Sequence, residues 1–186
     1  MSKSFYRILL PALALFAGMA VAGAAEQQEP EATIELATLC PAEHARFTAG
    51  PVGALQVEEY YRRQHNQLQW QDAARRQQLR FLFDELRYDG LLPAEYNSGL
   101  QQAGSSAEVS SCLDAEITHD HLLALHHLRN GRLQQEKVES YWVESAAAVK
   151  QYAPVVELAL QTPDDLAASF LTARPAQLMY TQLREQ

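Results

Sequence analysis

Four of the six histidines lie within residues 113–133, and histidine is the side chain that most often binds metals or moves protons near neutral pH. On a helix, His119 and His126 share a side but are separated by about 10 Å of rise, too far for one metal ion. His126 and His127 point about 100° apart. His121 falls on the apolar face, where a hydrogen-bonded core histidine is expected. With no HExxH pattern and no cysteine at zinc-ligand spacing, we predict no metal site and no cofactor.

Nucleophiles and acid–base pairs are equally sparse. No GxSxG or SxxK motif occurs, and neither Cys40 nor Cys112 has the glycine-rich or histidine-adjacent neighbours that activate a thiol. The carboxylates near predicted helix starts are Asp114, Glu116, Asp164 and Asp165. Acids in a first helical turn more often stabilise the helix than act as general acids or bases. We therefore predict that the chain is not an enzyme.

The end of residues 113–133 offers a candidate binding surface instead. Arg129 and Arg132 flank a helix stop at Asn130-Gly131, and Tyr141 and Trp142 follow downstream. Arginine with aromatic residues is typical of protein interfaces and of surfaces that pair with carboxylates or stack on sugars. The alternative is that Arg129 binds the last carbonyls of the helix and the aromatics fill the core. We take Arg129, Arg132, Tyr141 and Trp142 as the candidate binding residues.

The element that positions these residues is a predicted central helix. A capping box from Ser111 to Asp114 opens it. Its apolar face is formed by Leu113, Ile117, His121, Ala124, Leu125 and Leu128. Leu122 and Leu123 extend the apolar surface to other sides, so the helix is expected to pack against neighbours on more than one flank.

Helical patterns also account for most of the remaining chain. They predict helices over residues 55–65, from an N-cap at Asp72 to a stop at Gly90, a short one from 91, one over 149–160, one after an N-cap at Thr162, and a last apolar stripe at Leu178, Met179 and Leu183. No internal repeat and no strand pattern occurs. The expected fold class is therefore all-α, a single compact bundle of about six to eight short helices.

The N-terminus is predicted to be a signal peptide over residues 1–25. Lys3 and Arg7 precede an apolar run over 8–21 and a small-residue cleavage site near Ala25, so export to the periplasm is expected. An uncleaved membrane anchor is the alternative. Residues 26–53 begin with an acidic, glutamine-rich run and are predicted to be a flexible or irregular leader.

Charge and cysteine content narrow the possible partners. Without Lys3 and Arg7, 13 basic residues face 23 acidic ones, a formal charge of −10. Such a chain binds nucleic acid or an anionic bilayer poorly, so we predict no nucleic-acid partner and no stable membrane span after cleavage. In an oxidising compartment, the two cysteines, Cys40 and Cys112, are expected to pair.

Four motifs carry a resemblance to a known family. They are YYRRQHNQLQW (60–70), RFLFDELRYDGLLPAEY (80–96), LLALHHLRNGRL (122–133) and PDDLAASFLTARPAQLMYTQLRE (163–185). In this order they resemble the N-terminal scaffold domain of YcbB-type periplasmic L,D-transpeptidases. The resemblance implies that residues 54–186 form a helical scaffold-like domain linked to peptidoglycan cross-linking.

The chain departs from those enzymes in its chemistry, because their Ser-His-Gly-Cys-x-Arg nucleophile motif is missing. No catalytic residue is transferred by the resemblance. The function expected from it is a non-catalytic periplasmic scaffold that binds an L,D-transpeptidase, another cell-wall enzyme or peptidoglycan. Two alternatives stay open: a truncated remnant of a full-length transpeptidase, and an independent cell-wall hydrolase with an unrecognised site.

Overall fold

The computed structural model describes residues 34–48, 50–132 and 154–185, and across them the chain is all-helical. Within these ranges there are eight α-helices, five of them with seven residues or more, and no strand. This confirms the predicted fold class. None of the described helices is both long and apolar enough to span a bilayer. The predicted signal peptide lies outside the described residues.

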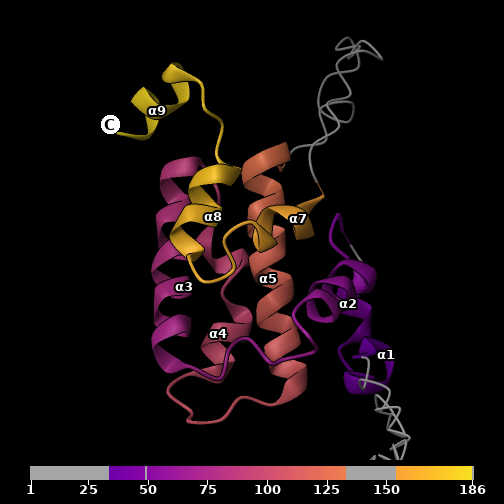
Figure 1. Cartoon of the computed structure of the whole chain (residues 1–186). Helices are drawn as coiled ribbons and strands as arrows, with labels where there is room; N and C mark the ends of the chain where they lie inside the picture. Colours follow the sequence, from indigo (N-terminus) through magenta and orange to yellow (C-terminus); the bar gives the residue numbers. More distant parts are fainter. Residues whose placement is uncertain (1–33, 49, 133–153, 186) are drawn as a thin grey trace, which may run out of the picture. The chain divides into compact units, whose positions relative to one another are not determined.

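Helix α5 (Ser111–Asn130) is surrounded by other helices, as its apolar residues on several sides predicted. Figure 1 shows it among α1 (Leu36–Leu39), α2 (Ala54–Arg63), α4 (Ser98–Ala103), α7 (Val155–Leu160) and α8 (Leu166–Ala173), all of which contact it. Twelve of its residues are buried, including polar ones such as Asp114 and His121. Gly131 ends it with φ 80°, a left-handed conformation that favours glycine.

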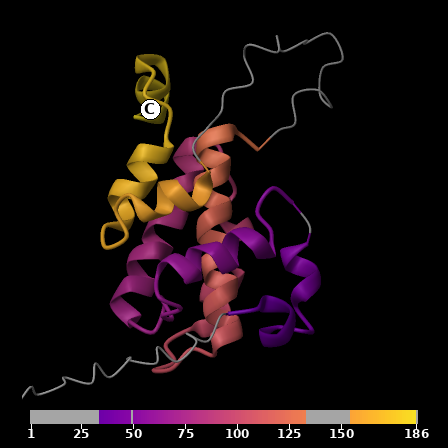
Figure 2. The ribbon, with the colours of Figure 1, turned by 45° about the vertical axis from the view of Figure 1, so that its right-hand side comes forward.

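Helix α3 (Ala73–Glu85) begins at the predicted N-cap, and the helical segment ends at the predicted Gly90, although its last turn is a 3₁₀ turn. The Asp72 carboxylate accepts a hydrogen bond from the Ala74 N–H at 2.8 Å, which satisfies one of the free donors of the first turn. A 3₁₀ turn, η2 (Leu86–Asp89), continues it until Gly90 takes φ 75°. The apolar stripe of α3 is buried and packs against α8 (Figure 2). A second 3₁₀ turn, η3 (Pro93–Glu95), precedes α4.

Two helix starts differ from the predicted ones. The N-cap of α5 is Ser110, whose hydroxyl accepts from the Leu113 N–H, so the capping box predicted from Ser111 does not form. The N-cap of α8 is Asp165, which accepts from the Ala168 N–H at 2.9 Å, while Thr162 lies in the preceding turn. In each case the predicted and the observed N-cap lie one or three residues apart, and both side chains can accept a hydrogen bond from the first turn. Local sequence does not decide which of two such residues becomes the N-cap.

Residues 34–48 and 50–53 contribute helical turns and buried side chains to the core, although we predicted them to be part of an irregular leader. They form α1 and the 3₁₀ turn η1 (His44–Phe47). Their buried side chains are Leu36, Cys40, Phe47 and Val52. Glu58 of α2 accepts from the Leu36 N–H at 2.9 Å, which ties α1 to α2. The folded region therefore begins before the predicted boundary at residue 54.

Helix α9 (Leu178–Arg184) buries none of its residues. The apolar stripe predicted there is exposed, with Leu178 at 73%, Met179 at 75% and Leu183 at 68%. The views in Figures 1 and 2 show α9 beyond the end of α8, joined to it by an extended segment. Its attachment to the other helices is polar, and this attachment forms the candidate site described below.

Candidate binding site

Asp114, one of the carboxylates considered for catalysis, is a structural acceptor. It is fully buried and accepts hydrogen bonds from the backbone N–H groups of Gln69 and Trp70 at 2.9 and 2.8 Å. The Tyr61 hydroxyl donates to it at 2.5 Å, and the Gln71 side-chain amide at 3.2 Å. Burial raises the pKa of Tyr61 well above its ordinary value, which keeps the phenol a donor. Asp114 therefore fastens the segment before α3 onto α5.

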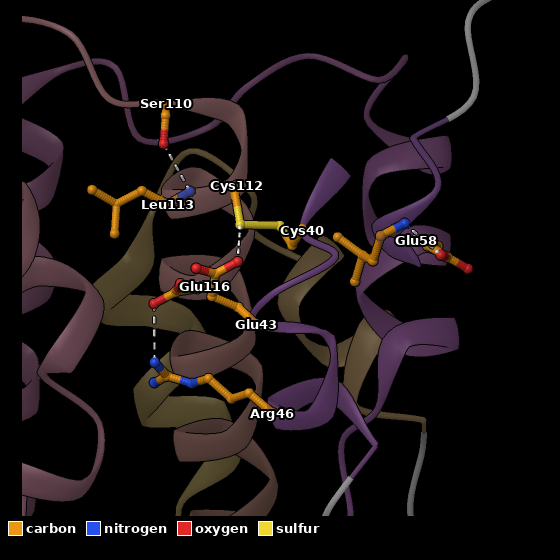
Figure 3. The surroundings of a disulfide bond; sticks show 9 residues. Cys40, Glu43, Arg46, Glu58, Ser110, Cys112, Leu113 and Glu116 are labelled. Atoms are coloured by element: carbon orange, nitrogen blue, oxygen red, sulfur yellow. Dashed lines mark hydrogen bonds and ion pairs between the residues drawn. A yellow bond between two sulfur atoms is a disulfide. The ribbon is translucent and has the colours of Figure 1, made fainter. Parts of the chain in front are cut away.

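Glu116 and Asp120 bind one guanidinium. Arg46 of η1 reaches Glu116 at 3.0 Å and Asp120 at 2.6 Å, and donates to the Ser98 hydroxyl at 2.5 Å. Burial raises the pKa of Glu116, and the charge of Arg46 opposes that rise. Figure 3 shows the Arg46–Glu116 pair beside the disulfide on the same face of α5. The pair and the disulfide both hold the η1 segment against α5.

The disulfide joins Cys40, directly after α1, to Cys112 in the first turn of α5, which confirms the predicted pairing. The two Cα atoms are 5.3 Å apart, a normal separation for a disulfide. The Glu43 carboxylate lies 3.7 Å from the Cys112 sulfur (Figure 3).

The histidine side chains of α5 do not converge on one point, as their spacing predicted. His119 lies against the Val52 carbonyl at 3.2 Å, and the His127 Nδ1 lies 2.8 Å from the Tyr96 hydroxyl. Burial lowers the pKa of His127 to about 4. No group of three or more His, Cys, Asp or Glu side chains suited to a metal ion occurs among the residues that the structure describes.

His121 is a core residue, but it is not the hydrogen-bonded one that we predicted. Neither ring nitrogen has a hydrogen-bond partner within the described parts of the chain. The ring stacks on Phe170 at 5.8 Å between centroids and lies edge-to-face with Trp70. Burial lowers its pKa to about 3, so the ring is neutral at physiological pH and packs as an aromatic.

A groove lies between the C-terminal end of α5 and helices α8 and α9, and we call it the arginine groove. Its volume is about 420 Å³. It is lined by Arg129 of α5, Leu171 of α8, Arg174 directly after α8, and Tyr180 and Arg184 of α9. Three of its lining side chains are arginines and none is acidic.

A buried carboxylate organises the groove. Asp89, with 1% of its side chain exposed, accepts three hydrogen bonds from Arg174 at 2.9 to 3.1 Å. The Tyr180 hydroxyl donates to it at 2.5 Å and the Arg184 Nε at 3.0 Å. Burial, followed by the bond to Asp89, raises the pKa of Tyr180. Glu85 also pairs with Arg184 at 3.4 Å, so the two carboxylates together offset the charges of Arg174 and Arg184.

Exposed apolar side chains lie on the helices that form the arginine groove. Leu171, which lines it, is 70% exposed. The exposed stripe of α9 (Leu178, Met179 and Leu183) lies on the helix that contributes Tyr180 and Arg184 to the groove. Exposed apolar side chains together with arginine are typical of protein interfaces, so this surface can bind the apolar face of a partner.

The structure separates the predicted binding residues. Arg129 lines the arginine groove, and one of its contacts is a hydrogen bond to the Thr172 carbonyl at 3.2 Å. Arg132 instead forms an exposed ion pair with Glu95 at 2.6 Å. Tyr141 and Trp142 lie outside the described residues.

Sequence reasoning missed three groove residues, Arg174, Tyr180 and Arg184. One signal was available, because Tyr180 and Arg184 are four residues apart and so share a helix face distinct from the apolar stripe. Their common partner, Asp89, lies at least 85 residues away and leaves no local signal.

Comparison with known proteins gives one match. The family model described as Scaffold domain matches residues 55–186, from α2 to the last residue of the chain. The chain matches none of the curated proteins and none of the solved structures with which we compared it.

Proposed function

Because the chain belongs to the Scaffold domain family over residues 55–186, we propose that it is a non-catalytic scaffold protein of the periplasm that binds a cell-wall enzyme of the L,D-transpeptidase type. The four motifs that resemble YcbB-type transpeptidases support the link to peptidoglycan cross-linking. The predicted signal peptide supports the location.

The observation that carries the proposal is the exposed apolar stripe of α9 beside the arginine groove. Exposing Leu171, Leu178, Met179 and Leu183 leaves apolar area in water, which is unfavourable unless a partner covers it. The hydrogen bonds of Arg174, Tyr180 and Arg184 to Asp89 hold α9 so that this stripe faces outward.

The exposed apolar stripe favours a protein as the occupant. Apolar side chains bury well against an amphipathic protein segment. A glycan strand offers little apolar surface to cover four large side chains. We therefore assign this surface to an amphipathic segment of the enzyme.

Affinity purification from envelope extracts tests this function. The wild-type chain should recover an L,D-transpeptidase or another cell-wall enzyme, and a double variant, Leu178→Ser with Leu183→Ser, should lose it. Leu55→Ser is the matched control, because Leu55 is an equally exposed leucine, at 78%, on α2 and not on α9.

Binding to purified sacculi is measured in parallel. Sedimentation with sacculi and no recovery of an enzyme would replace the proposed partner with peptidoglycan. Equal recovery of the enzyme by the double variant would remove the exposed stripe of α9 from the proposal.

A further inference from the structure

A second cleft, separate from the arginine groove, lies between α3 and the loop after α4. Its volume is about 450 Å³, within the range of small-ligand sites. It is lined by Ala73, Arg76, Gln77 and Arg80 of α3 and by Gly104 and Ser105. We call it the α3 cleft.

The charge of Arg76 is buried in this cleft without an anion. Only 3% of the residue is exposed, and its terminal nitrogens donate to the carbonyl oxygens of Trp70, Gln71 and Ser106 at 2.6 to 2.8 Å. Its Nε has no hydrogen-bond partner among the described residues. Carbonyl dipoles offset part of the cost of burying the charge, but they do not neutralise it.

Arg80 lies four residues further along α3 and lines the same cleft. Its hydrogen bond to a described residue goes to the Leu100 carbonyl at 2.9 Å, so it also points to a neutral acceptor. Across the described residues, no carboxylate forms an ion pair with Arg76 or Arg80, whereas Arg46, Arg62, Arg63, Arg132, Arg174 and Arg184 all do. Arg75 and Arg87 likewise form no ion pair with a described carboxylate, but they do not line the cleft. Arg76 and Arg80 are thus the two guanidiniums of the cleft, and neither is paired with a described carboxylate.

We propose that the α3 cleft binds a small polar ligand through an oxyanion, a carboxylate or a phosphate, held by Arg80, while the buried charge of Arg76 attracts the anion without contacting it. The planar guanidinium matches the spacing of two oxyanion oxygens. The Gln77 amide and the Ser105 hydroxyl line the same cleft as polar groups for the rest of the ligand.

Amide chemical shifts of the full exported chain, titrated at constant ionic strength, test the proposal. The probes are N-acetyl-alanine for a carboxylate, inorganic phosphate, and the neutral N-acetyl-alanine amide. Saturable shifts at Gln77, Arg80, Gly104 and Ser105 are expected with at least one anion, with a dissociation constant of roughly 1 mM, and none with the amide. The anion that binds more tightly identifies the ligand's charged group.

The variant for this site is Arg80→Gln, which should weaken binding by about tenfold or more. Arg62→Gln removes one arginine on α2 outside the cleft and should leave the affinity unchanged. Should Arg80→Gln lower the melting temperature, Arg80→Lys, which keeps the charge and loses the planar fork, should bind with intermediate affinity. Equal affinity in wild type and Arg80→Gln, or shifts that do not saturate with either anion, would refute the site.

Discussion

At the scale of single residues, the polar side chains of α5 that suggested chemistry are part of the core. Asp114 is the clearest case, since backbone and side-chain donors from three positions before α3 and from Tyr61 converge on it. These donors lie 43 to 53 residues away along the chain. The sequence showed an acid in a first helical turn, and local rules favoured a capping role that the structure assigns to Ser110.

His121 makes the stability of the fold depend on pH. Its pKa is about 3 in the folded chain against an ordinary value of 6.5, so the unfolded chain binds a proton that the folded chain does not. The free energy of unfolding is therefore unaffected by this histidine above pH 6.5. It decreases as the pH falls from 6.5 toward 3, because the unfolded chain takes up the proton first.

His121→Phe keeps the ring packing against Phe170 and removes the titration. Between about pH 7 and pH 4.5, the variant should lose roughly 2 kcal/mol less free energy of unfolding than the wild type. Urea denaturation at the two pH values measures this. The same loss of free energy in both proteins would show that the pKa of His121 is not lowered in the folded chain.

At the scale of elements, α4 and α5 approach each other at Gly99. A Cβ at this position would lie 2.9 Å from the Ile117 side chain and 3.2 Å from its backbone nitrogen, closer than packed atoms approach. Gly99→Ala should therefore lower the free energy of unfolding by about 1–3 kcal/mol. Thermal and urea denaturation check the loss, with the exposed Gln102→Ala on the same helix as the control. Equal stability of the two variants would mean that the α4–α5 contact is looser than described.

The elements also show how far sequence reasoning reaches. Three helix boundaries depend on neighbouring residues and were predicted correctly. They are the N-cap of α3 at Asp72, the end of the following 3₁₀ turn at Gly90, and the end of α5 at Gly131. The outward face of α9 was missed, because it depends on Asp89, which Arg174, Tyr180 and Arg184 reach from 85 to 95 residues away. Hydrophobic period alone predicts a stripe but not whether the stripe faces the core or a partner.

At the scale of the whole molecule, the disulfide joins the first helix to the central one. Cys40 and Cys112 are 72 residues apart, and closing a loop of that length stabilises the folded state by about 4 kcal/mol in the chain-entropy model. Reduction should lower the melting temperature and should first remove amide-exchange protection from α1 and η1. A double variant, Cys40→Ser with Cys112→Ser, should melt at the reduced temperature with or without reductant. An unchanged melting temperature on reduction would show that the Arg46 contacts and the packed core hold this segment without the bond.

The exposed stripe of α9 beside the arginine groove is the surface that we propose contacts a cell-wall enzyme. The most direct test places a photo-crosslinking amino acid at position 183 in living cells, with position 55 as the control, because both positions hold an exposed leucine. After irradiation, the adducts are identified by mass spectrometry. We predict an adduct between position 183 and an L,D-transpeptidase or another cell-wall enzyme, and none with that enzyme from position 55. No enzyme adduct at position 183, or the same adduct at both positions, would contradict the account.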